Sequence, residues 1–157
     1  MTVTPVSSFD LPALQPYRTL RRPVDHQKQG IFVAEGEKVV RRLLESNLEI
    51  LSILLTEEWL ASLRGNLEHR NSPPELFVAP KKLVETIVGF PLHQGIMAVG
   101  RIPKPHALDD VLRTSPEPFF FVAVDGLTNA ENLGVLVRNC AAFGVQSILV
   151  GETSSSP

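Results

Sequence analysis

The residues best suited to chemistry lie in the stretch DGLTNAENLGVLVRNCAAFG, residues 125–144. On a helix, Glu131, Gly134 and Arg138 would share one side, and Asn132 lies beside them in the sequence. A glycine inside a helix costs about 0.5–1 kcal/mol relative to alanine, which favours close approach by a ligand or another backbone. A guanidinium one turn further along is suited to phosphate. From the spacing alone, a solvated arginine and a tolerated glycine explain the pattern equally well.

The same stretch predicts the helix that would hold these side chains. Thr128 and Glu131 fit the T-x-x-E capping box, and Gly144 is expected to end the helix. The helix is predicted over 129–143, with an apolar stripe facing a sheet, made of Leu133, Leu136, Val137, Cys140 and Phe143. The strands FFFVAVDGL and QSILV on either side complete one β-α-β unit. The first is apolar throughout, which is typical of a parallel strand covered on both faces.

Strands and helices alternate upstream of this unit. Residues 1–12 are rich in Pro, Ser and Thr and predict a loose segment, and a short helix broken by Pro23 is expected next. The alternation over residues 30–102 predicts an α/β layer fold. Strands are predicted at GIFVAEG, EILSILLT, PPELFVAP and QGIMAVGRI. The intervening helices are EGEKVVRRLLESN (with a stripe of Val39, Val40, Leu43 and Leu44), EEWLASLRGNLEHR (weakening at Gly65) and PKKLVETIVG.

Composition divides the chain into three parts. Residues 15–102 are expected to form an independent α/β domain. Residues 103–118 contain four prolines around a short helical patch, ALDDVLR, and predict a linker. Residues 119–157 are expected to start a second domain.

Charge and cysteine content restrict the function classes. The net charge of −2 gives no global basic field, so nucleic-acid binding must come from local patches. One such patch is the cluster Arg18, Arg21, Arg22, His26 and Lys28, which either grips an RNA backbone or is a solvated basic segment. The single Cys140 and the unpatterned histidines predict neither a disulfide framework nor a metal site. Without a secretory signal or membrane-spanning apolar stretch, a cytoplasmic location is expected.

Two separate segments resemble one enzyme family. DGLTNAENLGVLVRNCAAFGVQSILV resembles the first motif of the SpoU class (TrmH-like, SPOUT superfamily) of RNA ribose 2′-O-methyltransferases, with the pattern Asn-x-Gly-x-x-x-Arg at Asn132, Gly134 and Arg138. GIFVAEGEKVVRRLLES and LHQGIMAVGRIP resemble that family's N-terminal substrate-binding domain. The resemblance implies a small ribosomal-protein-like α/β sandwich followed by the first β-α-β unit of a trefoil-knot methyltransferase domain, knots being rare exceptions among folds.

The resemblance also implies roles for residues. Arg138 would act on the ribose 2′-hydroxyl, and Asn132 would position Arg138 or the nucleotide backbone, although Asn132 could instead simply bond within the first turn of its helix. His93 and Gln94 match a tripeptide before the last strand of the substrate-binding domain, where they would read an RNA base edge or form the turn. The RNA would be ribosomal or transfer RNA.

The family's second and third motifs form the knot and bind S-adenosylmethionine. They are expected after Pro157, so this chain is expected to be an N-terminal fragment, inactive alone, from an enzyme that is a homodimer when complete. The strand FFFVAVD would then leave apolar surface uncovered. Two alternatives remain. One is a non-catalytic RNA-binding module. The other, a nucleotide-binding oxidoreductase fragment, is disfavoured because DGLTNAENLG is not a G-x-G-x-x-G loop.

Overall fold

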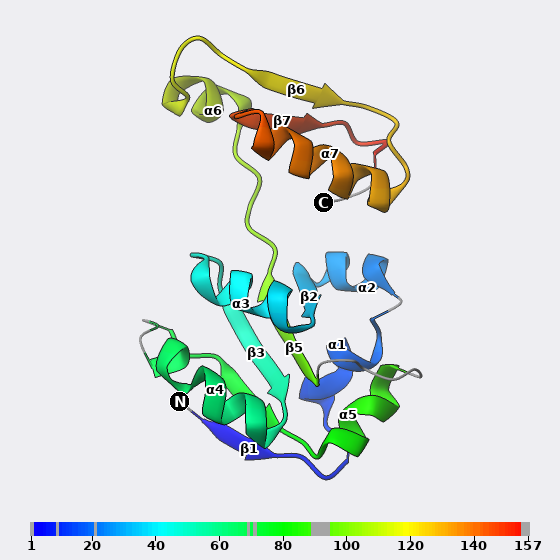
Figure 1. The fold of residues 1–157 in the computed structure, drawn as a ribbon. Helices are drawn as coiled ribbons and strands as arrows, with labels where there is room; N and C mark the ends of the chain where they lie inside the picture. Colours follow the sequence, from blue (N-terminus) through cyan, green and yellow to red (C-terminus); the bar gives the residue numbers. More distant parts are fainter. Residues whose placement is uncertain are drawn as a thin grey trace. The chain divides into compact units, whose positions relative to one another are not determined.

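The computed structural model describes residues 2–8, 10–20, 22–68, 70, 72–88 and 95–154. The chain divides into two compact units, Met1–Lys104 (unit 1) and Pro105–Pro157 (unit 2), and the division falls inside the segment predicted as a linker. Most elements of both units are labelled in Figure 1.

Unit 1 is built on a five-stranded sheet in the order β1-β4-β3-β5-β2 (Figure 1). The parallel strands β1, β4 and β3 lie on one side, and β5 runs antiparallel to both β3 and β2. The strands are β1 (Val3–Pro5), β2 (Ile31–Glu35), β3 (Ile50–Leu55), β4 (Glu75–Val78) and β5 (Ile96–Arg101). The helices are η1 (Pro12–Leu14), α1 (Gln15–Arg18), α2 (Pro23–Lys28), α3 (Glu37–Glu45), α4 (Glu57–Glu68) and α5 (Lys81–Val88).

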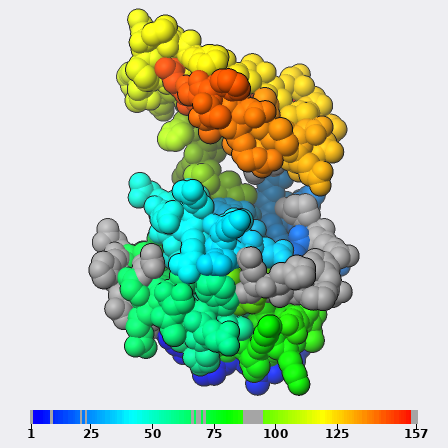
Figure 2. Space-filling view, viewed as in Figure 1, coloured from blue at the N-terminus to red at the C-terminus, as the bar shows by residue number. Residues whose placement is uncertain are grey.

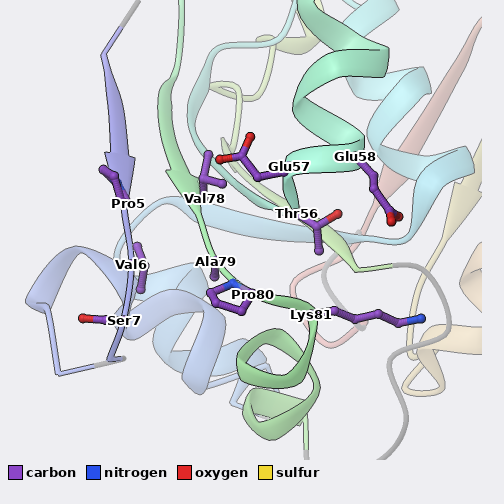
Figure 3. Close-up of a pocket in the computed structure, with 10 residues that line it drawn as sticks. All are labelled: Pro5, Val6, Ser7, Thr56, Glu57, Glu58, Val78, Ala79, Pro80 and Lys81. Atoms are coloured by element: carbon purple, nitrogen blue, oxygen red, sulfur yellow. The ribbon is translucent and has the colours of Figure 1, made fainter.

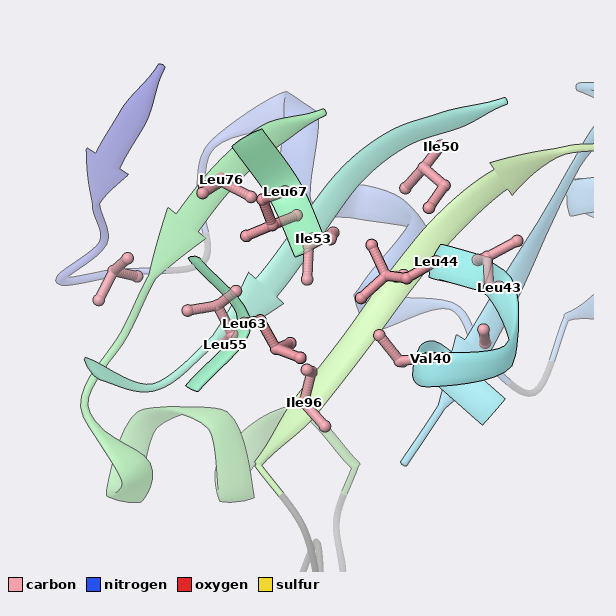
Figure 4. Packing of buried hydrophobic residues seen from close by; sticks show 13 residues of the cluster. Val40, Leu43, Leu44, Ile50, Ile53, Leu55, Leu63, Leu67, Leu76 and Ile96 are labelled. Atoms are coloured by element: carbon pink, nitrogen blue, oxygen red, sulfur yellow. The ribbon is translucent and has the colours of Figure 1, made fainter. Parts of the chain in front are cut away.

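The core of unit 1 lies on both faces of this sheet. Alternate residues of β3 point to opposite faces, so Ile53 and Leu55 enter one hydrophobic cluster and Leu54 the other. The first cluster packs β3 and its neighbours against α3 and α4, which supply Val40, Leu43, Leu44, Leu63 and Leu67 (Figure 4). The second includes Leu14 of η1, Tyr17 of α1 and Val84 of α5. The predicted α/β sandwich is confirmed.

Four local features differ from the sequence-based expectations. Residues 3–5, expected to be loose, form edge strand β1, which pairs in parallel with β4 and tolerates Pro5 because an edge strand has one unpaired side. Pro23 begins α2 instead of breaking a helix, since a proline is favoured at the first helical position. Helix α4 continues through Gly65. Val39, placed on the apolar stripe of α3, is 53% exposed.

Two side-chain contacts support the sheet of unit 1, one between neighbouring strands and one between helix α1 and strand β3. Phe32 lies opposite Gly100 in the pairing of β2 with β5, and a Cβ atom at position 100 would come within 2.4 Å of the Phe32 ring. The ring therefore occupies the space that a side chain at position 100 would need. On the other side, the buried Tyr17 hydroxyl lies 2.7 Å from Ser52 Oγ. Burial raises the pKa of Tyr17 above its usual value.

Unit 2 contains α6 (Leu108–Thr114), β6 (Phe121–Val124), α7 (Ala130–Ala142) and β7 (Ser147–Val150). Strands β6 and β7 are parallel neighbours joined through α7, which is the predicted β-α-β unit. The predicted stripe on α7 is only partly correct. Leu133 and Cys140 are buried, whereas Val137 is 41% exposed and Phe143 is 77% exposed. The two described strands cover a narrow band of the helix and leave the outer members of the stripe uncovered.

Candidate functional site

Helix α7, which carries Asn132 and Arg138, begins with a cap one residue later than predicted. Asn129 is the N-cap residue, with extended backbone, and its Oδ1 accepts a hydrogen bond from the Asn132 amide at 3.0 Å. The predicted capping box with Thr128 as the cap is therefore wrong. Asparagine is at least as good a cap as threonine, and here it is the residue in position to bond the first turn. The Asn132 backbone is thus used in the cap, while its side chain is exposed.

The C-terminal end of α7 matches the prediction. Gly144 has a φ of 73°, which favours glycine. The Val145 amide donates to the Cys140 carbonyl at 2.9 Å and the Gly144 amide donates to the Ala141 carbonyl at 3.3 Å. This pair of bonds is the Schellman motif, so both ends of α7 are defined by their own residues.

The exposed face of α7 places Gly134 beneath the side chain of Arg138. A Cβ atom built at position 134 would lie 3.4 Å from Arg138 Nη1, so the guanidinium lies back along the helix over the glycine. The expected sharing of one face by Gly134 and Arg138 is confirmed. Among the described residues, Arg138 makes no ion pair. The exposed surface of α7 is orange in Figure 2. The arrangement presents a guanidinium available to an anion.

A small pocket lies close to this helix, at the carboxyl ends of β6 and β7. It has a volume of about 320 Å³ and is lined by Ala123, Val124, Asp125, Leu149, Val150 and Gly151. Ligands of open α/β sheets bind at this edge, outside the carboxyl ends of parallel strands. Asp125 is the one ionisable side chain of this lining.

The basic cluster expected to bind RNA is only partly on the surface. Arg18, Arg22 and Lys28 are exposed, on or beside α1 and α2. His26 is buried, and its Nε2 lies 2.8 Å from Thr19 Oγ1, so it does not belong to an RNA-binding surface. The pairing of positions 19 and 26 spans two short helices and is not evident from the sequence. Arg21, His93 and Gln94 lie outside the described residues.

A second pocket was not anticipated from the sequence. It has a volume of about 580 Å³ and lies where β1, β3 and β4 end and α4 and α5 begin (Figure 3). Its lining combines Glu57 and Glu58 with Lys81 among mainly apolar residues. The sequence does contain an indication of this pocket, because a pair of like charges follows shortly after each of two strands, in TEE and APKK. None of the described candidate site residues lines it.

The described part of the chain holds neither a group of metal-ligating side chains nor a helix that could span a membrane. Within it, no three His, Cys, Asp or Glu side chains are grouped so that they could hold a metal ion. None of the helices in the described ranges has the length and apolar character needed to cross a membrane.

Comparison with known proteins connects these features to one group of enzymes. No family model matches the chain. It is 29% identical over 162 residues to an uncharacterized tRNA/rRNA methyltransferase of Mycobacterium tuberculosis, covering 100% of this chain and 54% of that protein. It is 32% identical over 141 residues to the 23S rRNA (guanosine-2′-O-)-methyltransferase RlmB of Shewanella oneidensis, covering 82% of this chain and 54% of RlmB.

Solved structures agree with these relatives. An rRNA methyltransferase from Sinorhizobium meliloti has a TM-score of 0.79 at 21% identity and covers 100% of this chain and 58% of that chain. The SpoU methyltransferase AviRb from Streptomyces viridochromogenes, in complex with AdoMet, has a TM-score of 0.71 at 18% identity and covers 93% and 53%. The chain is a relative of the SpoU-class RNA methyltransferases. The structural likeness shows that it shares the SpoU fold.

The SpoU relationship confirms the resemblance noted from Asn132, Gly134 and Arg138. The chain spans about half the length of the curated SpoU relatives that it matches. The roles of individual residues are not tested by these likenesses.

Proposed function

We propose that the chain forms part of an S-adenosylmethionine-dependent RNA ribose 2′-O-methyltransferase acting on ribosomal or transfer RNA. The observation that carries this proposal is the exposed guanidinium of Arg138, laid over Gly134 on a helix capped at both ends. The similarity of the chain to a guanosine-2′-O-methyltransferase of Shewanella oneidensis supports the same reaction class. A cytoplasmic location and a homodimeric assembly of the complete enzyme are part of the same proposal.

Arg138 is proposed to bind and polarise, not to act as a free base. A guanidinium has a pKa above 12 and holds its proton at neutral pH. It can orient the 2′-hydroxyl, hold the neighbouring phosphate through paired hydrogen bonds, and stabilise the alkoxide as it forms. Asn132, which lies six positions before Arg138 and is also exposed, is proposed to hold Arg138 or the nucleotide backbone through its side-chain amide.

S-adenosylmethionine would supply an electrophilic methyl group to the ribose oxygen. The described residues of unit 2 do not fit this cofactor, because the pocket at the carboxyl ends of β6 and β7 is otherwise apolar beside Asp125. We therefore assign none of the described residues to the methyl donor.

Unit 1 is proposed to bind the RNA backbone. Arg22 and Lys28 lie at the two ends of α2, six positions apart, which is about 9 Å along a helix axis. Together with the exposed Arg18, they would contact successive phosphates without reading sequence. A non-catalytic RNA-binding role is the second candidate, favoured by the two complete core clusters of unit 1.

The catalytic proposal is tested on the full-length protein encoded by the gene. Transfer of labelled methyl groups to ribosomal and transfer RNA is measured, and the modified ribose is mapped by primer extension. Arg138→Ala is expected to lower the turnover by about 10²–10³, the usual effect of losing one well-placed electrostatic contact. Arg113→Ala is the matched control, since Arg113 is an exposed arginine of the same unit that pairs with Asp110. Near-normal turnover in Arg138→Ala would reject the assigned role.

The RNA-binding proposal is tested on the 157-residue chain by anisotropy of labelled RNA at several salt concentrations. The affinity is expected to be weak and to fall steeply with salt. Charge reversal of Arg22 and Lys28 to Glu should abolish it. The matched control reverses Arg64 and Lys82, which are exposed on α4 and α5 and change the net charge equally. Equal losses in both variants would show a response to net charge alone and reject the assigned patch.

A further inference from the structure

The loop between β6 and α7 is bonded to the turn that follows β7. Thr153 Oγ1 donates to Asp125 Oδ1 at 2.5 Å, and the Gly126 amide donates to Thr153 Oγ1 at 3.2 Å. One residue further along, the Leu127 amide donates to Ser154 Oγ at 3.3 Å. Two consecutive hydroxyls therefore satisfy two consecutive amides of a loop 27 residues earlier in the chain.

The turn is itself anchored to the end of β6. The Gly151 amide donates to the Val124 carbonyl at 2.7 Å, and the Ser154 amide donates to the Gly151 carbonyl at 3.0 Å. Ser154 Oγ also lies 3.5 Å from the Val124 carbonyl, toward which it donates. Ser154 thus joins the last residue of β6 to the loop that leaves it.

Gly151 leaves the space that the Asp125 carboxylate occupies. A Cβ atom at position 151 would come within 2.4 Å of Asp125 Oδ1 and 3.0 Å of its Cγ. A side chain there would displace the carboxylate and, with it, the acceptor of the Thr153 hydroxyl. The segment G-E-T-S after β7 therefore contacts the loop D-G-L before α7 through close packing as well as through hydrogen bonds.

The position of α7 depends on this loop. Three residues separate Asp125 from the cap residue Asn129, so a shift of the loop moves the helix start. Leu133 and Cys140 are the buried residues of α7. With so few buried side chains, packing against the two strands holds the helix only weakly in position. We propose that Thr153 and Ser154 are positioning residues, which hold the start of α7 and thereby place Asn132 and Arg138 for the reaction. This inference rests on the proposed function for what those two side chains do.

The first test measures amide hydrogen exchange by NMR on the 157-residue chain. Thr153→Val keeps the shape of the side chain but removes its hydroxyl, and Ser154→Ala does the same for the next residue. Exchange at Gly126 and Leu127, respectively, is expected to rise roughly tenfold, because each amide loses its acceptor. The resonance of the Asn132 amide should shift as the cap moves. Thr153→Ser should restore the wild-type rates, and Thr114→Val on α6 should leave both amides unchanged. Wild-type exchange at Gly126 and Leu127 in the double variant would overturn the proposal.

The second test measures methyl transfer by the full-length protein. In the Thr153→Val, Ser154→Ala double variant, kcat is expected to fall while KM for RNA stays constant. The separate Thr153→Ser variant keeps a hydroxyl and should have most of the wild-type activity. An active wild-type protein whose double variant keeps its kcat would overturn the positioning role. A wild-type protein without methyl transfer would reject the proposed function, and the exchange rates and the Asn132 resonance would still decide whether the two hydroxyls hold the helix.

Discussion

The two units of the chain differ in how far they cover their own apolar surface. In unit 1, the five-stranded sheet carries a hydrophobic cluster on each face. In unit 2, α7 packs on two strands, and Phe119, Phe120 and Phe143 are 46%, 50% and 77% exposed. The expectation that the first strand of unit 2 would leave apolar surface uncovered is confirmed. A two-stranded sheet cannot cover a helix of 13 residues and its own two faces, so the closed hydrophobic core lies in unit 1.

The largest expected difference between the units is resistance to proteolysis. Subtilisin should cut first within residues 103–107, leaving unit 1 intact, because unit 1 has a closed core. Residues 116–118 should resist for longer, since the Gln146 side chain donates to the Pro116 and Pro118 carbonyls. Mass spectrometry of the first fragments checks both statements. Initial cleavage within residues 31–88 would contradict the closed core of unit 1.

A core substitution in unit 1 should cost about 2–5 kcal/mol of unfolding free energy. Leu54 is fully buried in the second cluster, and Leu54→Ala removes apolar contacts and leaves a cavity. Urea unfolding measures the effect. Val39→Ala serves as the control in the same unit, because Val39 is exposed and should change the free energy by less than about 0.5 kcal/mol. Similar small losses in both variants would mean that unit 1 is loosely packed.

The buried tyrosine makes unit 1 sensitive to alkali. Because the pKa of Tyr17 is raised in the folded state, its stabilising contribution is complete below the unfolded value of about 10 and is lost as the pH rises above it. The unfolding free energy should fall by about 1 kcal/mol per pH unit there. Tyr17 is the single tyrosine, so its ionisation can be followed directly by ultraviolet absorbance. Tyr17→Phe should remove this slope, and tyrosinate forming near pH 10 in the folded protein would contradict the prediction.

The cap of α7 should contribute about 1 kcal/mol to unit 2. Asn129→Ala removes the acceptor of the Asn132 amide and should lower the local opening free energy of α7 by this amount, as measured by hydrogen exchange. Asn139→Ala, at an exposed position in the last turn of the same helix, is the control. If Thr128→Ala has the larger effect, the capping box inferred from the sequence would be reinstated.

The smallest expected effect on folding comes from the exposed apolar side chains of unit 2. We expect these exposed side chains to make the 157-residue chain self-associate. Phe143→Ser should change the unfolding free energy by less than about 0.5 kcal/mol, yet reduce this self-association. Sedimentation at several concentrations measures the association. Val24→Ser, at a position in unit 1 that is 60% exposed, should leave it unchanged. Equal self-association of the two variants would contradict the idea that the apolar surface of unit 2 differs from that of unit 1.

Most of this architecture could be predicted because its signals are local. Apolar runs such as ILSILL and the amphipathic pattern of EKVVRRLLE determine β3 and α3 within a few residues. Strand β1 could not be predicted, because a three-residue strand ending in proline depends on β4, more than 70 residues away. The choice between Thr128 and Asn129 as the cap was also beyond local rules, since both residue types cap helices and the preceding loop decides.

In the candidate site too, features set by local spacing could be predicted from the sequence, whereas features set by contacts between distant segments could not. Gly134 and Arg138 were placed on one face because helical periodicity alone decides it. The hydrogen bonds of the Thr153 and Ser154 hydroxyls could not be predicted from the sequence, because their partners lie in another segment. His26 was misassigned to the surface for a similar reason, since its burial depends on Thr19.

Because Phe32 and Gly100 are in contact, the effect of a substitution at either position depends on the residue at the other. Adding a methyl group at position 100 would force the aromatic ring out of its place across the sheet. Replacing the ring first would make room for that methyl group. In a double-mutant cycle, Gly100→Ala should therefore be far less harmful in a Phe32→Leu background than alone, an interaction expected for residues in direct contact. The order in which substitutions arise would thus decide which of them this sheet can accept.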